Sequence, residues 1–233
     1  MKSHLNETPF DELLGFHEEC KRLVEKKYIK NKTVLDIGCG FGWCVWYLLN
    51  GGATRVKGID ISNELVAIAR TIPDKRAEIT VGSAIDLPYK KNTFDTVVSW
   101  ETLEHIPKNT EPKMFRDVYK VLKPGGYFFF STQHNNFFST ILDPAWWLIG
   151  HRHYSRDALI RFAETSGFTV EKIYLKGGVY TLFETLNMYF SKWVLSRQPL
   201  YKTFFYEHCR EEYKKDSGFM NFFVKCKKPL KTV

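Results

Sequence analysis

The chain has 233 residues, of which 44% are hydrophobic and 26% charged, and its formal net charge is +8. This length allows one well-packed domain, and the composition excludes a disordered or fibrous protein. The five cysteines form no CxxC pair, and charged residues or proline interrupt the longest apolar stretches. We therefore expect reduced thiols, no structural metal and no membrane span.

The two ends of the chain differ in character. The first 16 residues have no apolar core behind a basic start, so we expect no secretory signal and a cytoplasmic protein. Between Ser191 and Val233, ten Lys/Arg stand against four Asp/Glu. This basic, aromatic part either contacts an anionic surface such as a membrane or is an ordinary solvated face, and both interpretations stay open.

The first two thirds of the chain alternate between two periodicities. Residues 10–28 have near-helical spacing of apolar side chains, so 1–32 is predicted to be an N-terminal helical cap. Short apolar runs predict strands, with helices between most of them and a turn at 123–126. The strands are expected at 33–37, 55–59, 77–81, 96–100 and 127–132, and the helices at 43–50, 63–71 and 112–121. Such alternation predicts a parallel sheet, with 33–132 as the cofactor-binding core.

The pattern loosens after residue 132. Residues 134–152 are an aromatic loop or short helix, Ser155 is placed to cap a helix that Gly167 ends, and 168–175 is a strand. A mostly helical stretch follows over 179–215, and 219–226 is the last strand. We interpret the chain as a single domain, 1–233, whose C-terminal part, 133–233, carries a helical insertion at about 177–217.

A glycine-rich loop follows the first predicted strand. Gly38, Gly40 and Gly42 have the spacing GxGxG and are followed by bulky Trp43. A dinucleotide fingerprint would be GxGxxG, so this loop departs from it. No GK[ST] follows, which excludes a Walker loop. Asp36 precedes the glycines and favours an uncharged or cationic ligand over a phosphate. Asp60 ends the neighbouring strand 22 residues after Gly38, where a carboxylate can accept hydrogen bonds from a ribose diol.

With these motifs the chain resembles class I S-adenosylmethionine-dependent methyltransferases, particularly the small type 11 group. The resemblance lies in VLDIGCGFG, GIDIS, GSAIDLPYKKNTFDTVVSWETLEHIP and RDVYKVLKPGGYFFFST. It implies an α/β, Rossmann-like, doubly wound and mostly parallel seven-stranded sheet, with an antiparallel last strand and a helical insertion before it.

The resemblance also implies S-adenosylmethionine as cofactor and assigns residues to it. Asp86 would meet the adenine amino group, Ala84 and Ile85 would flank the ring, and Trp100 or Glu101 would border the methyl-transfer site. The full expected set of cofactor-binding residues is Asp36, Gly38, Cys39, Gly40, Gly42, Asp60, Ile61, Ser83, Ala84, Ile85, Asp86, Trp100 and Glu101.

Histidines supply the candidate catalytic groups. His105 follows the fourth predicted strand and His134 the fifth, so both are candidate general bases near neutral pH, or else hydrogen-bonded loop residues. His151 and His153 lack a third ligand of suitable spacing, so no metal site is predicted.

Seven apolar residues of the insertion form one stripe at helical spacing: Val179, Leu182, Phe183, Leu186, Phe190, Trp193 and Val194. This stripe packs on the sheet or on a second subunit in a homodimer, or it forms a lid over an apolar acceptor or an interfacial membrane helix.

Three functions compete on this evidence. The first is methyl transfer to a small-molecule acceptor, apolar, aromatic or lipid-linked, by in-line displacement. The second is a non-catalytic nucleoside-binding or membrane-interaction module. A nicotinamide-dependent oxidoreductase is disfavoured by Trp43. Nucleic acid is disfavoured as a partner, because SWETLEHIP stands where an NPPY-like run would be needed for a flipped base.

Overall fold

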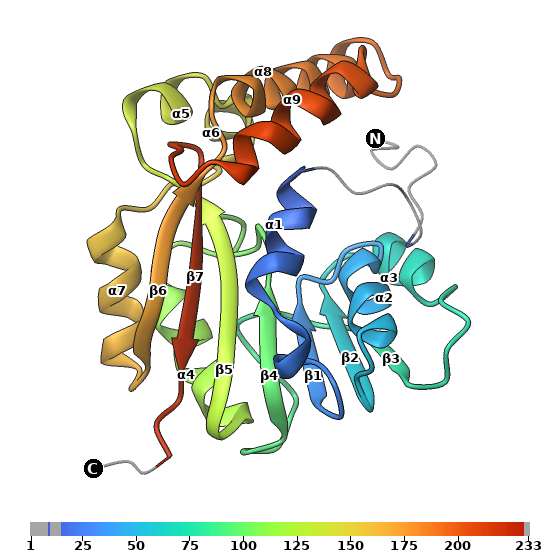
Figure 1. Ribbon diagram of the computed structural model, residues 1–233, viewed down its shortest axis with the longest axis vertical. Coiled ribbons are helices and arrows are strands. Elements are labelled where there is room, and N and C mark those ends of the chain that lie inside the picture. Colours follow the sequence, from blue (N-terminus) through green and yellow to red (C-terminus); the bar gives the residue numbers. More distant parts are fainter. Residues whose placement is uncertain (1–8, 10–14, 231–233) are drawn as a thin grey trace.

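The computed structural model describes residue 9 and residues 15–230 of the chain. Seven strands form one sheet in the order β3-β2-β1-β4-β5-β7-β6, with helices on both faces (Figure 1). Neighbouring strands are parallel except for β7, which runs antiparallel to both β5 and β6. The predicted fold class, including the antiparallel last strand and the helical insertion before it, is confirmed.

The elements have the following bounds. The strands are β1 Thr33–Ile37, β2 Arg55–Asp60, β3 Ala77–Val81, β4 Phe94–Ser99, β5 Leu122–Gln133, β6 Thr169–Lys176 and β7 Asn221–Lys227. The helices are α1 Gly15–Leu23, η1 Lys26–Tyr28, α2 Trp43–Asn50, α3 Asn63–Ala69, α4 Glu111–Val121, α5 Phe137–Ile141, α6 Pro144–Ile149, α7 Arg156–Thr165, α8 Val179–Tyr189, η2 Phe190–Val194 and α9 Lys202–Lys214.

The central strands of the sheet are buried on both faces, which explains why β1, β4 and β7 are mostly apolar in sequence. Successive side chains of a strand point to opposite faces, so Val98 packs with α1, α2 and α3 while its neighbour Val97 packs with α4 and α7. The carboxyl ends of the parallel strands meet at one edge, at the top of Figure 1. Strand order reverses between β1 and β4, and this is where a parallel sheet opens a crevice for a ligand.

Two local predictions differ from the structure. The expected turn at Lys123–Gly126 lies inside β5, where the pairing with β4 shifts register between Phe94 and Thr96. Gly125 has the positive φ expected of a glycine in this turn, +78°, so the chain bends within the strand and does not end it. The helix expected at 63–71 ends at Ala69. Residues 1–8 and 10–14 of the predicted N-terminal cap lie outside the described residues.

The helical insertion covers the carboxyl end of the sheet. Helices α8 and α9 lie side by side, and the Glu212 carboxylate of α9 accepts hydrogen bonds from the backbone N–H groups of Gly178, Tyr180 and Thr181 at 2.8–2.9 Å. These bonds satisfy the N–H groups at the start of α8. Within the apolar stripe only Leu182 is buried, whereas Val179, Phe183, Phe190 and Val194 are exposed. Packing within the domain therefore buries only a part of the stripe. No helix formed by the described residues is long and apolar enough to cross a lipid bilayer.

Candidate functional site

The loop after β1 brings three glycines into left-handed backbone conformations. Their φ angles are +71° at Gly38, +52° at Gly40 and +96° at Gly42. A Cβ at Gly38 would lie 2.1 Å from the hydroxyl of Thr102, and one at Gly42 would lie 3.0 Å from Ala69. A Cβ at Gly40 would meet no protein atom within 4 Å. Gly38 and Gly42 are thus required for packing, while Gly40 is the place where the backbone faces open space and a ligand can approach.

Asp60 ends β2 and holds this loop in position. One oxygen of its carboxylate accepts a hydrogen bond from the N–H of Gly40 at 2.9 Å, and the other accepts one from the N–H of Ser62 at 2.9 Å. Each carboxylate oxygen has a second lone pair, and the side chain is half-buried, so Asp60 can still accept hydrogen bonds from a diol. The structure therefore gives Asp60 a structural role in addition to the predicted ribose-binding role.

Asp36 lies deeper than the sequence suggested. We expected a carboxylate at the mouth of the loop, but Asp36 is only 1% exposed. Among the described residues, its Oδ2 has no hydrogen-bond partner. Burial, followed by the nearby charge of Asp60, raises the pKa of Asp36 to about 8. An orphaned buried carboxylate beside an open loop is suited to a cationic group, and this fits the sulfonium and ammonium groups of S-adenosylmethionine.

The predicted adenine-binding segment follows β3 as a turn. The Ser83 hydroxyl accepts a hydrogen bond from the N–H of Ile85 at 3.3 Å, and the Ser83 carbonyl accepts one from the N–H of Asp86 at 3.2 Å. Ala84 and Ile85 are partly buried, and Asp86 is exposed. Ile61, just after Asp60, is 78% exposed, which is unusual for a large apolar residue. The contacts of these residues with adenine and ribose stay predictions, and the exposure of Ile61 and Asp86 is compatible with them.

Two residues predicted to contact the cofactor have their side chains in the core. Trp100 is buried, and its indole N–H donates to the Cys44 sulfur at 3.2 Å. Cys39 is also buried and packs in the cluster formed with α1, α2 and α3. Cys39 could therefore contact a ligand only with its backbone.

Glu101 is the centre of a buried polar network at the end of β4. It adopts a φ of +46°, which is rare for a residue other than glycine and is most common at functional sites. Its carboxylate accepts hydrogen bonds from the Ser131 hydroxyl at 2.7 Å, from the Asn221 amide at 3.1 Å and from the amide of Gln133. Burial raises the pKa of Glu101, and the donors around it counteract that shift.

Glu104, three residues further in the loop after β4, completes the network. The Thr132 hydroxyl donates to its Oε2 at 2.9 Å, and within the described part of the chain its buried Oε1 has no hydrogen-bond partner. Burial, followed by the charge of Glu101, raises the pKa of Glu104 well above its usual range. Sequence reasoning did not select Glu104, Ser131, Gln133 or Asn221. The signal for the first three is that they follow or end strands at the carboxyl edge of the sheet.

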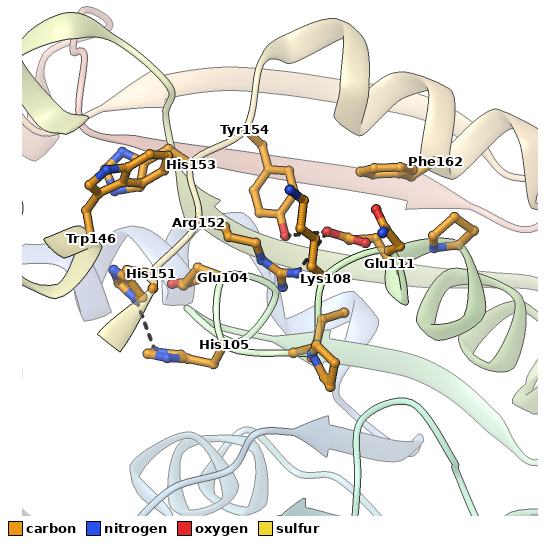
Figure 2. A pocket seen from close by; sticks show the side chains of 15 residues that line it. Glu104, His105, Lys108, Glu111, Trp146, His151, Arg152, His153, Tyr154 and Phe162 are labelled. Atoms are coloured by element: carbon orange, nitrogen blue, oxygen red, sulfur yellow. Dashed lines mark hydrogen bonds and ion pairs between the residues drawn. The ribbon is translucent and has the colours of Figure 1, made fainter. Parts of the chain in front are cut away.

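A second cluster joins three histidines, which are labelled in Figure 2, to Asp143. Nε2 of His105 lies 3.2 Å from Nε2 of His151. Nδ1 of His151 and Nε2 of His153 both lie 2.9 Å from the same oxygen of Asp143. These two imidazoles hold the pKa of Asp143 well below its usual range, despite the opposing effect of burial.

The hydrogen bonds of this cluster determine where its protons are. An ionised carboxylate only accepts hydrogen bonds, so His151 must carry its proton on Nδ1 and, when neutral, must accept at Nε2. With His151 neutral, His105 donates from Nε2 and its Nδ1 keeps a lone pair. With His151 protonated, the bond reverses and Nδ1 of His105 carries the proton. Desolvation, followed by the neighbouring His151, lowers the pKa of His105, so this imidazole is neutral near pH 7.

The two predicted candidate bases do not lie together. His134 has its Nδ1 2.9 Å from the carbonyl of Phe219, which commits one ring nitrogen to the backbone before β7. His105 instead lines a cavity of about 930 Å³ with His151, His153 and Tyr154 (Figure 2).

The missing third metal ligand is also supplied by the fold. Ligand atoms of Asp143, His151 and His153 lie within 4.8 Å of one another, as do those of Glu104, His105 and His151. The reason given for predicting no metal, the lack of a third ligand, therefore does not hold in three dimensions. Either group has the ligand atoms for a cation, but Asp143 already accepts hydrogen bonds from His151, His153 and the N–H of Ala145 without one.

Comparison with known proteins places the matched motifs in a family. Residues 34–126 match the family model described as "Methyltransferase domain". Phosphoethanolamine N-methyltransferase 1 of Triticum aestivum is 38% identical over 116 residues, which are 48% of this chain and 23% of that protein. Ubiquinone biosynthesis O-methyltransferase of Hydrogenovibrio crunogenus is 35% identical over 118 residues, 49% of this chain and 48% of that protein. The chain thus spans at most about half the length of these two relatives.

Solved structures agree over most of the chain. An S-adenosylmethionine-dependent methyltransferase from Mesorhizobium loti superposes with a TM-score of 0.61 at 21% identity, covering 86% of this chain and 93% of that one. A [4+2]-cyclase superposes with a TM-score of 0.66 at 18% identity, covering 93% of this chain and 82% of that one. The likeness to the cyclase means that the fold alone does not decide the reaction. On these comparisons, residues 34–126 match a methyltransferase domain, and the chain as a whole shares the fold of solved S-adenosylmethionine-dependent methyltransferases.

Proposed function

We propose that this protein transfers a methyl group from S-adenosylmethionine to a small-molecule acceptor. The observation that carries the proposal is the glycine loop, where Gly40 faces open space, Asp60 is anchored to the N–H of Gly40, and a carboxylate oxygen of Asp36 is buried without a partner. When bound, the cofactor supplies an electrophilic methyl on a sulfonium, which an oxygen, nitrogen or carbon nucleophile of the acceptor attacks in line.

The residues of the loop would bind and orient. The orphaned oxygen of Asp36 would accept from a cationic group, and the carboxylate of Asp60 would hold the ribose. The exposed Asp86 would accept from the adenine amino group, with Ile61 and Ile85 against the ring. Holding two reactants in a reactive arrangement is itself a large source of rate acceleration, so no nucleophilic side chain is needed.

The polar network at the end of β4 would border the acceptor. Glu101 is only partly buried, so its carboxylate can face the methyl-transfer site, and its three donors prevent it from turning away. His105 is the candidate base: while His151 is neutral, the Nδ1 of His105 would be unprotonated and could accept the proton that an acceptor loses when its O–H or N–H group is methylated. His151 and Asp143 would hold the His105 ring in this tautomer.

The chemical identity of the acceptor is supported less directly. Names of relatives include phosphoethanolamine and norajmaline N-methyltransferases and a ubiquinone biosynthesis O-methyltransferase, and all of these denote small-molecule acceptors. The exposed aromatic residues over the carboxyl edge favour an apolar or lipid-linked acceptor for this chain.

Calorimetry with S-adenosylmethionine and S-adenosylhomocysteine tests cofactor binding. Asp86→Asn changes an exposed side chain, so folding should be retained while affinity falls about fivefold, because a neutral amide oxygen replaces a charged acceptor. Glu164→Gln, a carboxylate-to-amide change on the exposed side of α7, should leave affinity unchanged. Absence of binding would refute the proposal. Binding without transfer of labelled methyl to any acceptor would favour the non-catalytic nucleoside-binding module.

A further inference from the structure

Large exposed apolar residues are concentrated in two segments of the chain. Seventeen of the described large hydrophobic residues are exposed, and fourteen of these lie in residues 137–147 and 179–204. We call these two segments the apolar end. The most exposed members are Phe137, Phe138, Trp147, Val194 and Tyr201, each between 61% and 78%. A soluble surface rarely gathers so many apolar side chains, so this one has a binding role.

The apolar end is one region in space. Helices α5 and α6 carry the first segment, and α8, η2 and the start of α9 carry the second, and both cover the same end of the molecule, at the top of Figure 1. A shallow groove of about 430 Å³ lies between α8 and α9, lined by aromatic residues such as Phe183, Phe190 and Phe204. This is also the end at which the parallel strands finish, so the apolar end lies over the edge where the cofactor loop begins.

The charges of the apolar end are unbalanced toward cations. The connection between α8 and α9 contains Lys192 and Arg197, and α9 begins with Lys202. Residues 191–206 include no Asp or Glu. Across both segments the sequence contains only two carboxylates. Asp143 is buried and bonded to two histidines, and burial raises the pKa of Glu184 to about 7. The surface therefore offers aromatic side chains and cations with almost no exposed negative charge.

We propose that the apolar end docks this protein on an anionic phospholipid membrane. Aromatic and aliphatic side chains enter the boundary between headgroups and acyl chains, and Arg197 and Lys202 pair with lipid phosphates. A second copy of the chain is a poorer occupant. A two-fold interface would place this patch against itself, and the patch has too few carboxylates to pair with its own cations. The proposal concerns binding alone and does not depend on methyl transfer.

Flotation with vesicles of phosphatidylcholine, with and without phosphatidylglycerol, tests the proposal. We expect the protein to float with the anionic vesicles, more weakly at high salt. Because each cation near an anionic membrane contributes about a fivefold factor, Arg197→Gln combined with Lys202→Gln should weaken partitioning roughly thirtyfold. Phe138→Ser combined with Val194→Ser should weaken it roughly tenfold or more, since both side chains are exposed in the free protein and would be buried in lipid.

Matched variants outside the apolar end serve as controls. Lys90→Gln with Lys91→Gln removes two charges before β4, at the opposite edge of the sheet, and Leu230→Ser removes a 74% exposed apolar side chain. Neither should change partitioning, and S-adenosylhomocysteine affinity should be unchanged in all variants. The proposal is overturned if the protein does not float, or if the controls weaken partitioning as much as the test variants. Light scattering that shows a dimer abolished by Phe138→Ser with Val194→Ser would also overturn it, and would assign the face to a second copy.

Discussion

Replacement of Gly40 by alanine separates a role in ligand approach from a role in folding. An alanine Cβ at this position meets no protein atom within 4 Å, so the cost in the free protein is the left-handed backbone alone, about 1–2 kcal/mol. For a chain of this size that corresponds to a fall in melting temperature of about 2–8 °C. The same methyl group lies at the point where a ligand would approach the loop. We therefore expect Gly40→Ala to weaken binding of S-adenosylhomocysteine at least about tenfold while the protein stays folded.

A second glycine provides the matched control. Gly52 also has a positive φ, +89°, and a Cβ there would meet its nearest atom, Cγ of Lys30, at an ordinary 3.5 Å. Gly52→Ala should thus lose a similar amount of stability and keep full affinity. Chemical denaturation gives the free energies of unfolding, and calorimetry gives the dissociation constants. The reasoning is wrong if Gly40→Ala binds as tightly as the wild type, or if Gly52→Ala loses as much affinity.

A contrast with Gly38 extends the test within the same loop. A Cβ at Gly38 would overlap the Thr102 hydroxyl at 2.1 Å, so the strand or the loop would have to move. Gly38→Ala should consequently lose clearly more stability than Gly40→Ala. Equal stabilities for the two variants would show that the loop can move to accommodate a Cβ at Gly38 without loss of stability.

Three further predictions concern buried ionisable groups. Asp36 has a raised pKa of about 8, so it is mostly protonated at pH 7. Binding of a cationic ligand should therefore release a proton, and Asp36→Asn should abolish this release. Calorimetry in buffers of different ionisation enthalpy measures the number of protons released. Glu104 also has a raised pKa, so it stabilises the fold at low pH and loses that contribution as the pH rises. From acidic to alkaline pH, the free energy of unfolding of Glu104→Gln should fall less than that of the wild type, and parallel curves would contradict this. Asp143→Asn removes the acceptor shared by His151 and His153 and should lower the free energy of unfolding by about 1–3 kcal/mol, whereas an unchanged melting temperature would show that the cluster is not held by these bonds.

Local patterns in the chain predicted most of the sheet. Apolar runs predicted the central strands because these are covered on both faces. The capping residue Ser155 was correctly placed before α7, where its hydroxyl accepts from the N–H of Ala158. The turn at Lys123–Gly126 was wrong because a glycine with positive φ can bend a strand as well as end it. The pairing with β4 that decides between these outcomes is a contact between distant residues.

The candidate site was predicted in part. The glycine spacing and the position of Asp60 are local features, so the loop could be recognised from sequence. The depth of Asp36 could not, because burial depends on the helices that cover β1. The side chain of Trp100 was assigned to the cofactor, whereas its hydrogen bond to Cys44 holds it in the core.

By itself the sequence determined the alternation of strands and helices, the glycine loop and the acid that follows it, because these depend on residues close together in the chain. Only the tertiary structure decided which polar side chains meet. The Glu101 carboxylate contacts Asn221, 120 residues away, because β7 lies next to β5 and starts at the edge where β4 ends. His105 contacts His151 instead of His134, because the segment after β5 folds back over the end of β4. The order of the strands and the path of the segment after β5 are set by the packing of the whole domain, so no short stretch of sequence predicts them.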